Sequence, residues 1–307
     1  ATTEAFLAEN LGGRFEPIEV GPEFTLTGAE QIGEAFAARL GAPSLQALRA
    51  LPASKIVAQR FHPQPNIDGF LLHESPYEAH AHGRVNDVDI LLGSNTEEGL
   101  YFVSGRSIGA NNLRDVLEQD FPSFIVSLIG PKQPADDLAA RAAFVAFESD
   151  MRFGWDMWAW ARLHADMGRR NTFLYRFSRR WPGEQGASHG AEMAYVFGHL
   201  DLRPLVWTEN DRRLADAMAS YWTNFARTGD PNAEGLPHWP AFTRSTQRAL
   251  LVGNEIRAEE IPNKADIAAI DRLYGAVRGV LEYGYVIAGV VGLLVLALLW
   301  WVAARFR

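Results

Sequence analysis

The chain has 307 residues, of which 48% are apolar and 21% charged, so it can build one large hydrophobic core or two ordinary ones. Its formal net charge is −8 and no run of Lys or Arg exceeds two, so we expect no nucleic-acid partner. The absence of cysteine excludes disulfides, thiolate metal sites and a cysteine nucleophile.

The first 20 residues lack the basic stretch and apolar segment of a secretory signal, so we expect them to belong to the middle of a domain. Residues 27–52 predict two short helices, separated by Gly41, Ala42 and Pro43. The elements predicted after them are a strand at 88–93, helices at 113–120 and 136–149, a Trp-rich helix at 151–168, a strand at 171–178, a helix at 211–227 ended by Gly229, and an amphipathic helix at 265–285. Strands that alternate with helices predict an α/β fold with a mostly parallel sheet covered on both faces.

Residues 286–304 form a stretch of 19 residues without a charge or a strongly polar group. A helix of this length spans about 28 Å, close to the ~30 Å hydrocarbon thickness of a bilayer, so the sequence predicts a transmembrane helix. Trp300 and Trp301 lie near its end, as in aromatic belts. The alternative is a buried helix of the globular domain, which usually shows a polar stripe.

The charges around this stretch predict its orientation. Arg305 and Arg307 lie in the basic tail 305–307, which by the positive-inside rule is expected in the cytoplasm. The preceding domain would then be extracytoplasmic, joined to the membrane by the juxtamembrane linker 276–285. Arg278 on the other side weakens this asymmetry.

Two loops that follow the strands offer groups suited to acid–base catalysis. Glu97 and Glu98 lie in the polar turn after the strand 88–93, and His189 lies between small residues after the strand 171–178. In α/β-hydrolases the acid precedes the histidine in the chain, and both lie on loops at the carboxyl ends of strands. The order found here is the same.

Four separated segments resemble the type-B carboxylesterase family, which includes the cholinesterases. They are IDGFLLHESPYEAHAHGRVNDVDILLG (67–93), GSNTEEGLYF (93–102), GASHGAEMAYVFG (186–198), and YWTNFARTGDPN (221–232) with the following WPAF (239–242). The resemblance covers most of residues 5–275. It implies that residues 1–275 are the C-terminal portion of an α/β-hydrolase domain whose N-terminal part, which bears the nucleophile, is absent.

The resemblance assigns roles to particular residues. Glu98 would be the triad acid, because the acid of the family directly precedes the glycine, and Glu97 is the competing carboxylate. His189 would be the general base, whose tautomer a carboxylate fixes. Tyr101 and Phe102 follow the acid where cholinesterase-like members place aromatic residues that bind substrate; packing in the core is the alternative.

Two segments match the Gly-x-Ser-x-Gly motif in which the nucleophile of an α/β-hydrolase lies. Ser107 lies nine residues after Glu98, on the wrong side of the acid, and Ser188 is adjacent to His189, so its side chain points elsewhere. In the family the nucleophile and the oxyanion loop precede the residues present here. We therefore expect this chain alone not to hydrolyse esters.

The leading interpretation is a membrane-anchored serine esterase that acts on a small-molecule ester when its N-terminal part is present. The alternative is a non-catalytic adhesion or binding protein, as in the neuroligins. A binding protein has no need of a pair such as Glu98 and His189. We expect no cofactor. His73, His80 and His82 form a cluster, but no thiolate is available and two residues apart on a helix point to different faces, so we expect no metal site. The tryptophans of 151–168 are expected to pack in the core.

Overall fold

The computed structural model describes residues 25–59, 65–280 and 283. The predicted transmembrane segment 286–304 and the basic tail lie outside this range, so both stay predictions. Among the described residues, no helix has the length and apolarity needed to cross a bilayer. The chain divides into two compact units, one from residues up to 75 and from 272 onwards, the other from Pro76 to Asp271.

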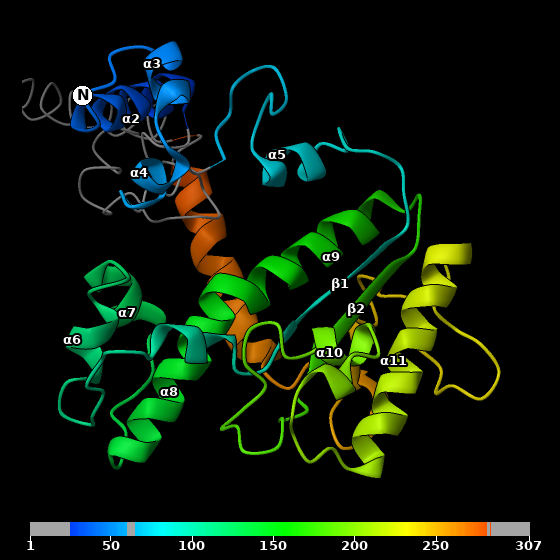
Figure 1. Cartoon of the computed structure of the whole chain (residues 1–307). Coiled ribbons are helices and arrows are strands. Elements are labelled where there is room, and N and C mark those ends of the chain that lie inside the picture. Colours follow the sequence, from blue (N-terminus) through cyan, green and yellow to red (C-terminus); the bar gives the residue numbers. More distant parts are fainter. Residues whose placement is uncertain (1–24, 60–64, 281–282, 284–307) are drawn as a thin grey trace, which may run out of the picture. The chain divides into compact units, whose positions relative to one another are not determined.

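In the first unit, residues 25–59 form the helices α2 (Leu26–Arg39), α3 (Leu45–Ala50) and α4 (Ala53–Val57) (Figure 1). Two of them match the helices predicted within 27–52. Thr25 caps α2 by accepting a hydrogen bond from the Gly28 amide over 3.1 Å. Gly41, with a φ of +64°, ends it as predicted, because glycine enters the left-handed region without steric cost.

The second unit is built on a four-stranded sheet in the order β1-β2-β3-β4. Its strands are β1 (Ile90–Asn95), β2 (Thr172–Phe177), β3 (Arg248–Val252) and β4 (Ile256–Glu260). β1, β2 and β3 pair in parallel and β4 is antiparallel to β3. The sheet is therefore mostly parallel, as the sequence predicts, while the hairpin of β3 and β4 was not predicted.

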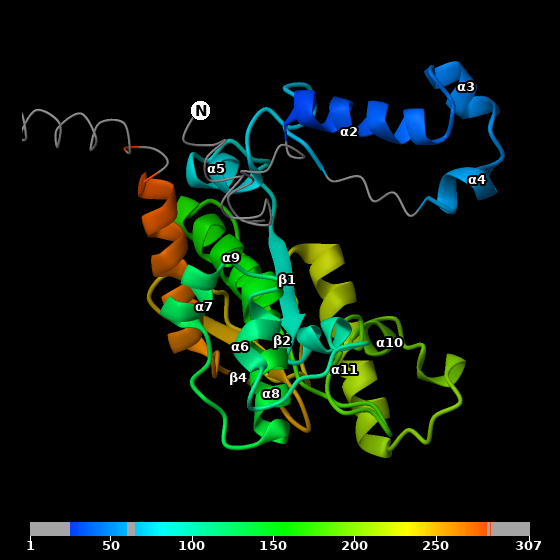
Figure 2. The same cartoon turned by 90° about the vertical axis from the view of Figure 1, so that its left-hand side faces the viewer.

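Helices connect the parallel strands. Between β1 and β2 lie the 3₁₀-helix η2 (Glu98–Phe102), α6 (Leu113–Leu117), α7 (Ser123–Ile129), α8 (Asp137–Ser149), the π-helical turn η3 (Asp150–Gly154) and α9 (Trp155–Met167). Between β2 and β3 lie α10 (Met193–Val196), η4 (Leu200–Leu202) and α11 (Glu209–Thr228), and α5 (Pro76–Ala81) precedes β1. Figure 2 shows α9 and α11 on opposite sides of the sheet.

Three predicted helices differ in detail from the observed ones. The segment predicted at 113–120 is helical only to Leu117, and the predicted Trp-rich helix begins as the π-helical turn η3. The C-terminal helical segment starts at residue 264 and continues to residue 280. Trp155 and Trp158 are buried as predicted, whereas Trp160 is exposed.

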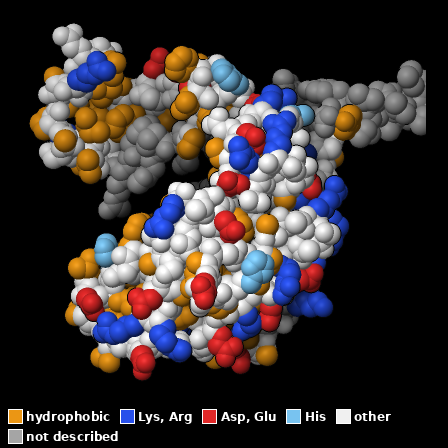
Figure 3. All heavy atoms as spheres, turned by 90° about the vertical axis from the view of Figure 1, so that its right-hand side faces the viewer, with side chains coloured by type: hydrophobic (Ala, Val, Ile, Leu, Met, Phe, Trp, Pro, Cys, Tyr) orange, Lys and Arg blue, Asp and Glu red, His pale blue; other side chains and the backbone are white. Residues whose placement is uncertain are grey.

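The core of the second unit lies between the sheet and α11. Met218 and Tyr221 of α11 are fully buried against a cluster that includes Phe177 of β2. A capping box of Thr208 and Asp211 starts the helix, and Gly229 ends it in the left-handed conformation. On the face drawn in Figure 3, basic and acidic side chains of the described residues are interspersed.

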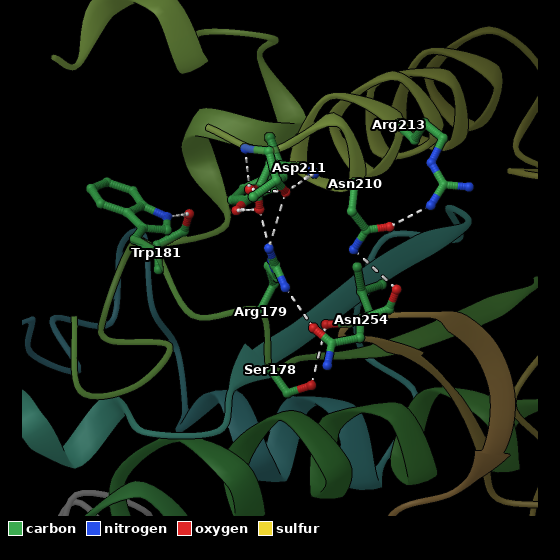
Figure 4. A network of polar contacts seen from close by, with 11 residues as sticks. Ser178, Arg179, Trp181, Asn210, Asp211, Arg213 and Asn254 are labelled. Carbon is green, nitrogen blue, oxygen red and sulfur yellow. Dashed lines mark hydrogen bonds and ion pairs between the residues drawn. The ribbon is translucent and has the colours of Figure 1, made fainter. Parts of the chain in front are cut away.

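An ion pair between a half-buried guanidinium and a buried carboxylate joins the residues that follow β2 to the start of α11 (Figure 4). Arg179 Nε donates to Asp211 Oδ1 over 2.6 Å, and Arg179 Nη1 donates to Asn254 Oδ1 over 2.5 Å. Tyr195 donates from its hydroxyl to the same carboxylate over 2.8 Å. This network fixes the segment that follows β2 and leads to His189.

Candidate active site

Glu98 lies where β1 has ended and η2 begins, at the carboxyl end of the parallel strands. Its side chain is buried, with 5% of the residue exposed. Oε2 lies 2.7 Å from Nδ1 of His189, and Oε1 accepts a hydrogen bond from the Asn95 amide over 2.8 Å. Both carboxylate oxygens therefore accept a hydrogen bond, which assigns the proton on the imidazole to Nδ1.

His189 lies in the loop between β2 and α10, as predicted for a group that follows the second strand. Its side chain is 57% exposed, in contrast to its buried partner. No hydrogen bond to Nε2 is found within the part of the chain that the structure describes. Because Nδ1 is engaged, Nε2 is left as an acceptor that faces outward from the pair.

Burial raises the pKa of Glu98 by disfavouring its charged form, and the nearby Glu192 adds to this effect. The Asn95 amide and the His189 ring oppose the shift, because both stabilise the carboxylate. The carboxylate is thus desolvated on most sides and is offered hydrogen bonds by two groups. Such a group interacts strongly with an imidazolium when one forms.

Glu97 does not contact His189 and has a different role. Its Oε2 accepts a hydrogen bond from the Ala187 amide over 2.7 Å, and its own amide donates to the Ala187 carbonyl over 3.1 Å. A Cβ on Gly186 would lie 2.7 Å from Glu97 Cγ, so only glycine fits there. Glu97 therefore fixes the histidine loop two residues before His189.

Asn95, which the sequence did not single out, connects the two loops. Its side-chain Nδ2 donates to the carbonyl oxygen of Ser188 over 2.8 Å and to Oε2 of Glu192 over 2.6 Å. Its backbone amide binds Glu98. One buried side chain thus holds the residues on both sides of His189.

Aromatic rings surround the histidine. Tyr101 is 71% exposed and its ring centroid lies 6.2 Å from that of His189. Phe102 packs edge-on against Tyr101 at 5.2 Å, and lies under the guanidinium of Arg152. Phe153 lies closer to the histidine than Tyr101 does, with ring centroids 5.2 Å apart. It was missed because it depends on the π-helical turn η3, a feature common at functional sites.

Neither serine pattern has a hydrogen bond to the acid–base pair. Ser107 is exposed in the loop that follows η2, and its carbonyl accepts from Asn112 Nδ2 over 3.0 Å. The strand that a nucleophile elbow requires is replaced there by the 3₁₀-helix η2. Ser188 contributes its carbonyl oxygen to Asn95.

The histidine cluster is engaged in local contacts. Nδ1 of His80 lies 2.7 Å from the Pro76 carbonyl, and Nδ1 of His82 lies 2.9 Å from the Glu78 carbonyl. Among the described residues, no group of three or more His, Cys, Asp or Glu side chains is arranged to hold a metal ion.

Comparison with known proteins identifies the family of the chain. The sequence profile of the carboxylesterase family matches residues 25–270. The chain belongs to the carboxylesterase family. Its fold is that of esterases: a structure of a thermophilic PNB esterase superimposes with a TM-score of 0.64 at 24% identity, covering 80% of this chain and 54% of that one.

Curated relatives of this carboxylesterase chain include two that are named as a lipase and an esterase, and a neuroligin. Bile salt-activated lipase of Bos taurus is 30% identical over 62% of this chain and 36% of that protein. Para-nitrobenzyl esterase of Bacillus subtilis is 28% identical over 65% and 41%. Neuroligin-3 of Homo sapiens is 30% identical over 60% and 26%. The chain spans less than half the length of each of these relatives.

Proposed function

We propose that this chain supplies the acid and the base of a serine carboxylic-ester hydrolase that acts on small-molecule esters. The observation that carries the proposal is the 2.7 Å hydrogen bond between buried Glu98 and His189, whose Nε2 remains available. The same carboxylate–imidazole arrangement serves nucleophilic catalysis on unrelated folds. Membership of the carboxylesterase family supports this reaction class.

The proposed mechanism has two half-reactions. In the first, His189 Nε2 takes the proton from a serine hydroxyl as its oxygen attacks the ester carbonyl, and then gives that proton to the leaving alcohol. In the second, it takes a proton from the water molecule whose oxygen attacks the acyl carbonyl, and it then gives that proton to the serine oxygen as the carboxylic acid leaves. Glu98 holds the ring in the Nδ1–H tautomer and stabilises the imidazolium in both.

The nucleophile and the oxyanion donors are proposed to come from a part of the domain outside these 307 residues. The short coverage of the relatives supports this, and the chain alone is then expected to be inactive. Tyr101 and Phe102 are proposed to contact the substrate. The exposure of Tyr101 beside His189 supports its assignment better than that of Phe102, whose ring is partly covered by Arg152.

Hydrolysis of a para-nitrophenyl ester tests the proposal. The 307-residue chain is compared with a protein in which these residues follow a nucleophile-bearing part of the domain. Activity is expected only in the longer protein, and His189→Ala should reduce it by about three to four orders of magnitude. A longer protein that is fully active with His189→Ala would refute the assignment, and serine-reagent-sensitive activity of the 307 residues alone would refute the missing nucleophile.

A non-catalytic adhesion or binding role is the second candidate, favoured by the 30% identity to neuroligin-3. It predicts that the longer protein binds a partner and leaves esters intact. An upstream sequence that has another residue in place of the serine nucleophile would support it. A binding protein does not require an imidazole with an available Nε2, which is why hydrolysis is preferred.

We further propose that residues 286–304 anchor the protein in a membrane as a single pass, with the esterase domain extracytoplasmic. The support is the uncharged length of this stretch and the basic residues after it. Retention in the membrane fraction after alkaline extraction, and loss of that retention on deletion of 286–304, would be expected. Release of the intact chain by alkaline extraction would contradict the anchor.

A further inference from the structure

A second buried carboxyl lies directly behind the acid–base pair. Glu148 occupies the last turn of α8 and is 0% exposed. Its Cβ is so close to η2 that a Cβ on Gly99 would lie 2.9 Å from it. Glu148 thus packs against Gly99, the residue next to Glu98. The carboxyl group of Glu148 takes no part in the proposed reaction.

The two oxygens of Glu148 have different surroundings. Oε2 accepts a hydrogen bond from Arg152 Nε over 2.6 Å. Oε1 is buried and meets no N–H or O–H donor among the described residues. The carboxyl of Asp120, itself only 8% exposed, lies within hydrogen-bonding reach of Glu148. Two carboxylates this close in a dry interior are stable when they share a proton.

The charges around the pair assign the proton to Glu148. Asp120 accepts from Nη1 and Nη2 of Arg106, and although burial raises its pKa, these bonds hold it below the usual range. Burial raises the pKa of Glu148 to about 7, and Arg152 opposes the shift only in part. Asp150, the other acid of this segment, pairs with Arg176 and Asn263 instead.

Arg152 connects this carboxyl pair to the rings beside the histidine. Its guanidinium lies over Phe102 at 4.6 Å and over Phe121 at 5.0 Å. Phe102 is the last residue of η2, which begins with Glu98, and it packs on Phe153 at 6.4 Å. Phe153 packs in turn on His189. Glu148 therefore packs on η2, the helix that begins with Glu98, and is connected to His189 through Arg152 and the rings of Phe102 and Phe153.

We propose that Glu148 is a positioning residue that acts in its protonated form: it donates its proton to Asp120, holds Arg152 between Phe102 and Phe121, and so fixes Glu98 and His189. Its effect on hydrolysis rests on the proposed function, whereas the proton bridge does not. Deprotonation replaces the hydrogen bond by repulsion between two carboxylates. The acid–base pair then loses part of its support as the pH rises.

The variant Glu148→Gln tests the proton bridge in the full 307-residue chain. Its amide group donates to Asp120 and its oxygen accepts from Arg152, which imitates the protonated acid at every pH. Between about pH 5 and about pH 8, the wild-type melting temperature should fall by about 4 °C or more relative to that of E148Q. The exposed Glu184→Gln is the matched control and should behave as wild type. Parallel pH curves for E148Q and the wild type would overturn the bridge.

The positioning role of Glu148 is tested by ¹⁵N NMR of the same chain, which measures the signals of the two imidazole nitrogens of His189. Glu148→Ala should shift these signals from their wild-type values. E148Q, which keeps the contacts of the protonated acid, should show the wild-type values at a pH where Glu148 is protonated. Unchanged His189 signals in a destabilised E148A would overturn positioning and leave a purely structural residue. If E148A does not fold, E148Q decides: its His189 signals should match those of the wild type near pH 5, and the difference between the two proteins should grow as the pH rises to about 8. Signals that coincide in the two proteins at every pH would contradict the proposal. Absence of esterase activity in the longer protein would refute the proposed function without changing either result.

Discussion

Asn95 donates a hydrogen bond from its side chain to the carbonyl oxygen of Ser188 over 2.8 Å, although 93 residues separate them. The bond ties the end of β1, which leads to the acid, to the residue directly before the base. The same Nδ2 also binds Glu192. The geometry of the pair thus depends on a residue that takes no part in proton transfer.

Replacement of Asn95 by Asp should loosen the histidine loop. The carboxylate would face the Ser188 carbonyl and the Glu192 carboxylate, so two hydrogen bonds become repulsive contacts. We expect the free energy of unfolding to fall by about 2–4 kcal/mol, measured by urea denaturation. Asn86→Asp, at an exposed asparagine away from the pair, is the comparison for general effects of the new charge. An N95D chain as stable as the wild type would contradict the role of the bond.

Gly186→Ala should be destabilising because of space and not because of backbone conformation. The new Cβ would lie 2.7 Å from Glu97 Cγ, and overpacking of this kind costs about 1–3 kcal/mol. In a Glu97→Ala background the cost should be smaller, because Cγ and Cδ are removed. A double-mutant cycle measures this coupling. Additive effects would show that Glu97 does not pack on Gly186.

Asp211→Ala should be one of the most destabilising substitutions in the second unit. Burial raises the pKa of this carboxylate, but hydrogen bonds from Arg179 and Thr208 outweigh burial and hold the pKa below its usual range. Its removal leaves Arg179, whose side chain is only 18% exposed, without its partner, which costs about 3–5 kcal/mol. Asp216→Ala, on the exposed face of the same helix, should cost less than about 0.5 kcal/mol. Similar losses in the two variants would contradict this assignment.

His164 should make the stability depend on pH. Burial lowers the pKa of its imidazole, and the neutral ring bridges Thr172 Oγ1 and the Val88 carbonyl at 2.7 and 3.0 Å. Because the unfolded chain binds the proton more readily, stability should be fully present above about pH 6.5 and should fall as the pH drops below that value. Thermal melts of the wild type and His164→Gln should diverge in this direction. Stability that rises on acidification in the wild type only would contradict it.

The two residues proposed as the acid–base pair could be selected from the sequence because their signals are local. A short apolar run followed by a polar turn with Glu97 and Glu98, and a histidine between glycines after a second strand, can be read without knowing the packing. The choice between the two glutamates rested on resemblance. In the structure Glu98 is hydrogen-bonded to His189, whereas Glu97 accepts a hydrogen bond from the backbone amide of Ala187 in the histidine loop.

Other features could not be predicted because they depend on contacts between distant segments. β4 has mostly exposed residues, and its apolar alternation is limited to Ile256 and Ala258, so its pairing with β3 is what identifies it as a strand. Phe153 packs on His189 because the chain forms the π-helical turn η3, and no residue of the Trp-rich segment indicates such a turn. The contacts of Glu148 likewise combine three separate elements, and a single glutamate in a helix pattern normally indicates a solvated face.

The tautomer of His189 should depend on Glu98 in the 307-residue chain. Both oxygens of Glu98 accept hydrogen bonds, so Glu98→Gln cannot satisfy the Asn95 amide and the Nδ1 proton together. With the amide nitrogen toward the ring, His189 should change to the Nε2–H form. ¹⁵N NMR of the neutral ring distinguishes the two forms, and Glu97→Gln should leave it unchanged. The same tautomer in wild type and E98Q would contradict the assignment.

The most direct test of the central claim compares the two neighbouring glutamates in a protein in which these residues follow a nucleophile-bearing part. Hydrolysis of para-nitrophenyl acetate is measured for Glu98→Gln and Glu97→Gln, with folding checked by thermal melts. If Glu98 orients His189 as the base, E98Q should reduce kcat by about 10⁴-fold and E97Q by less than about tenfold. A larger loss in E97Q than in E98Q, or full activity in E98Q, would contradict the account.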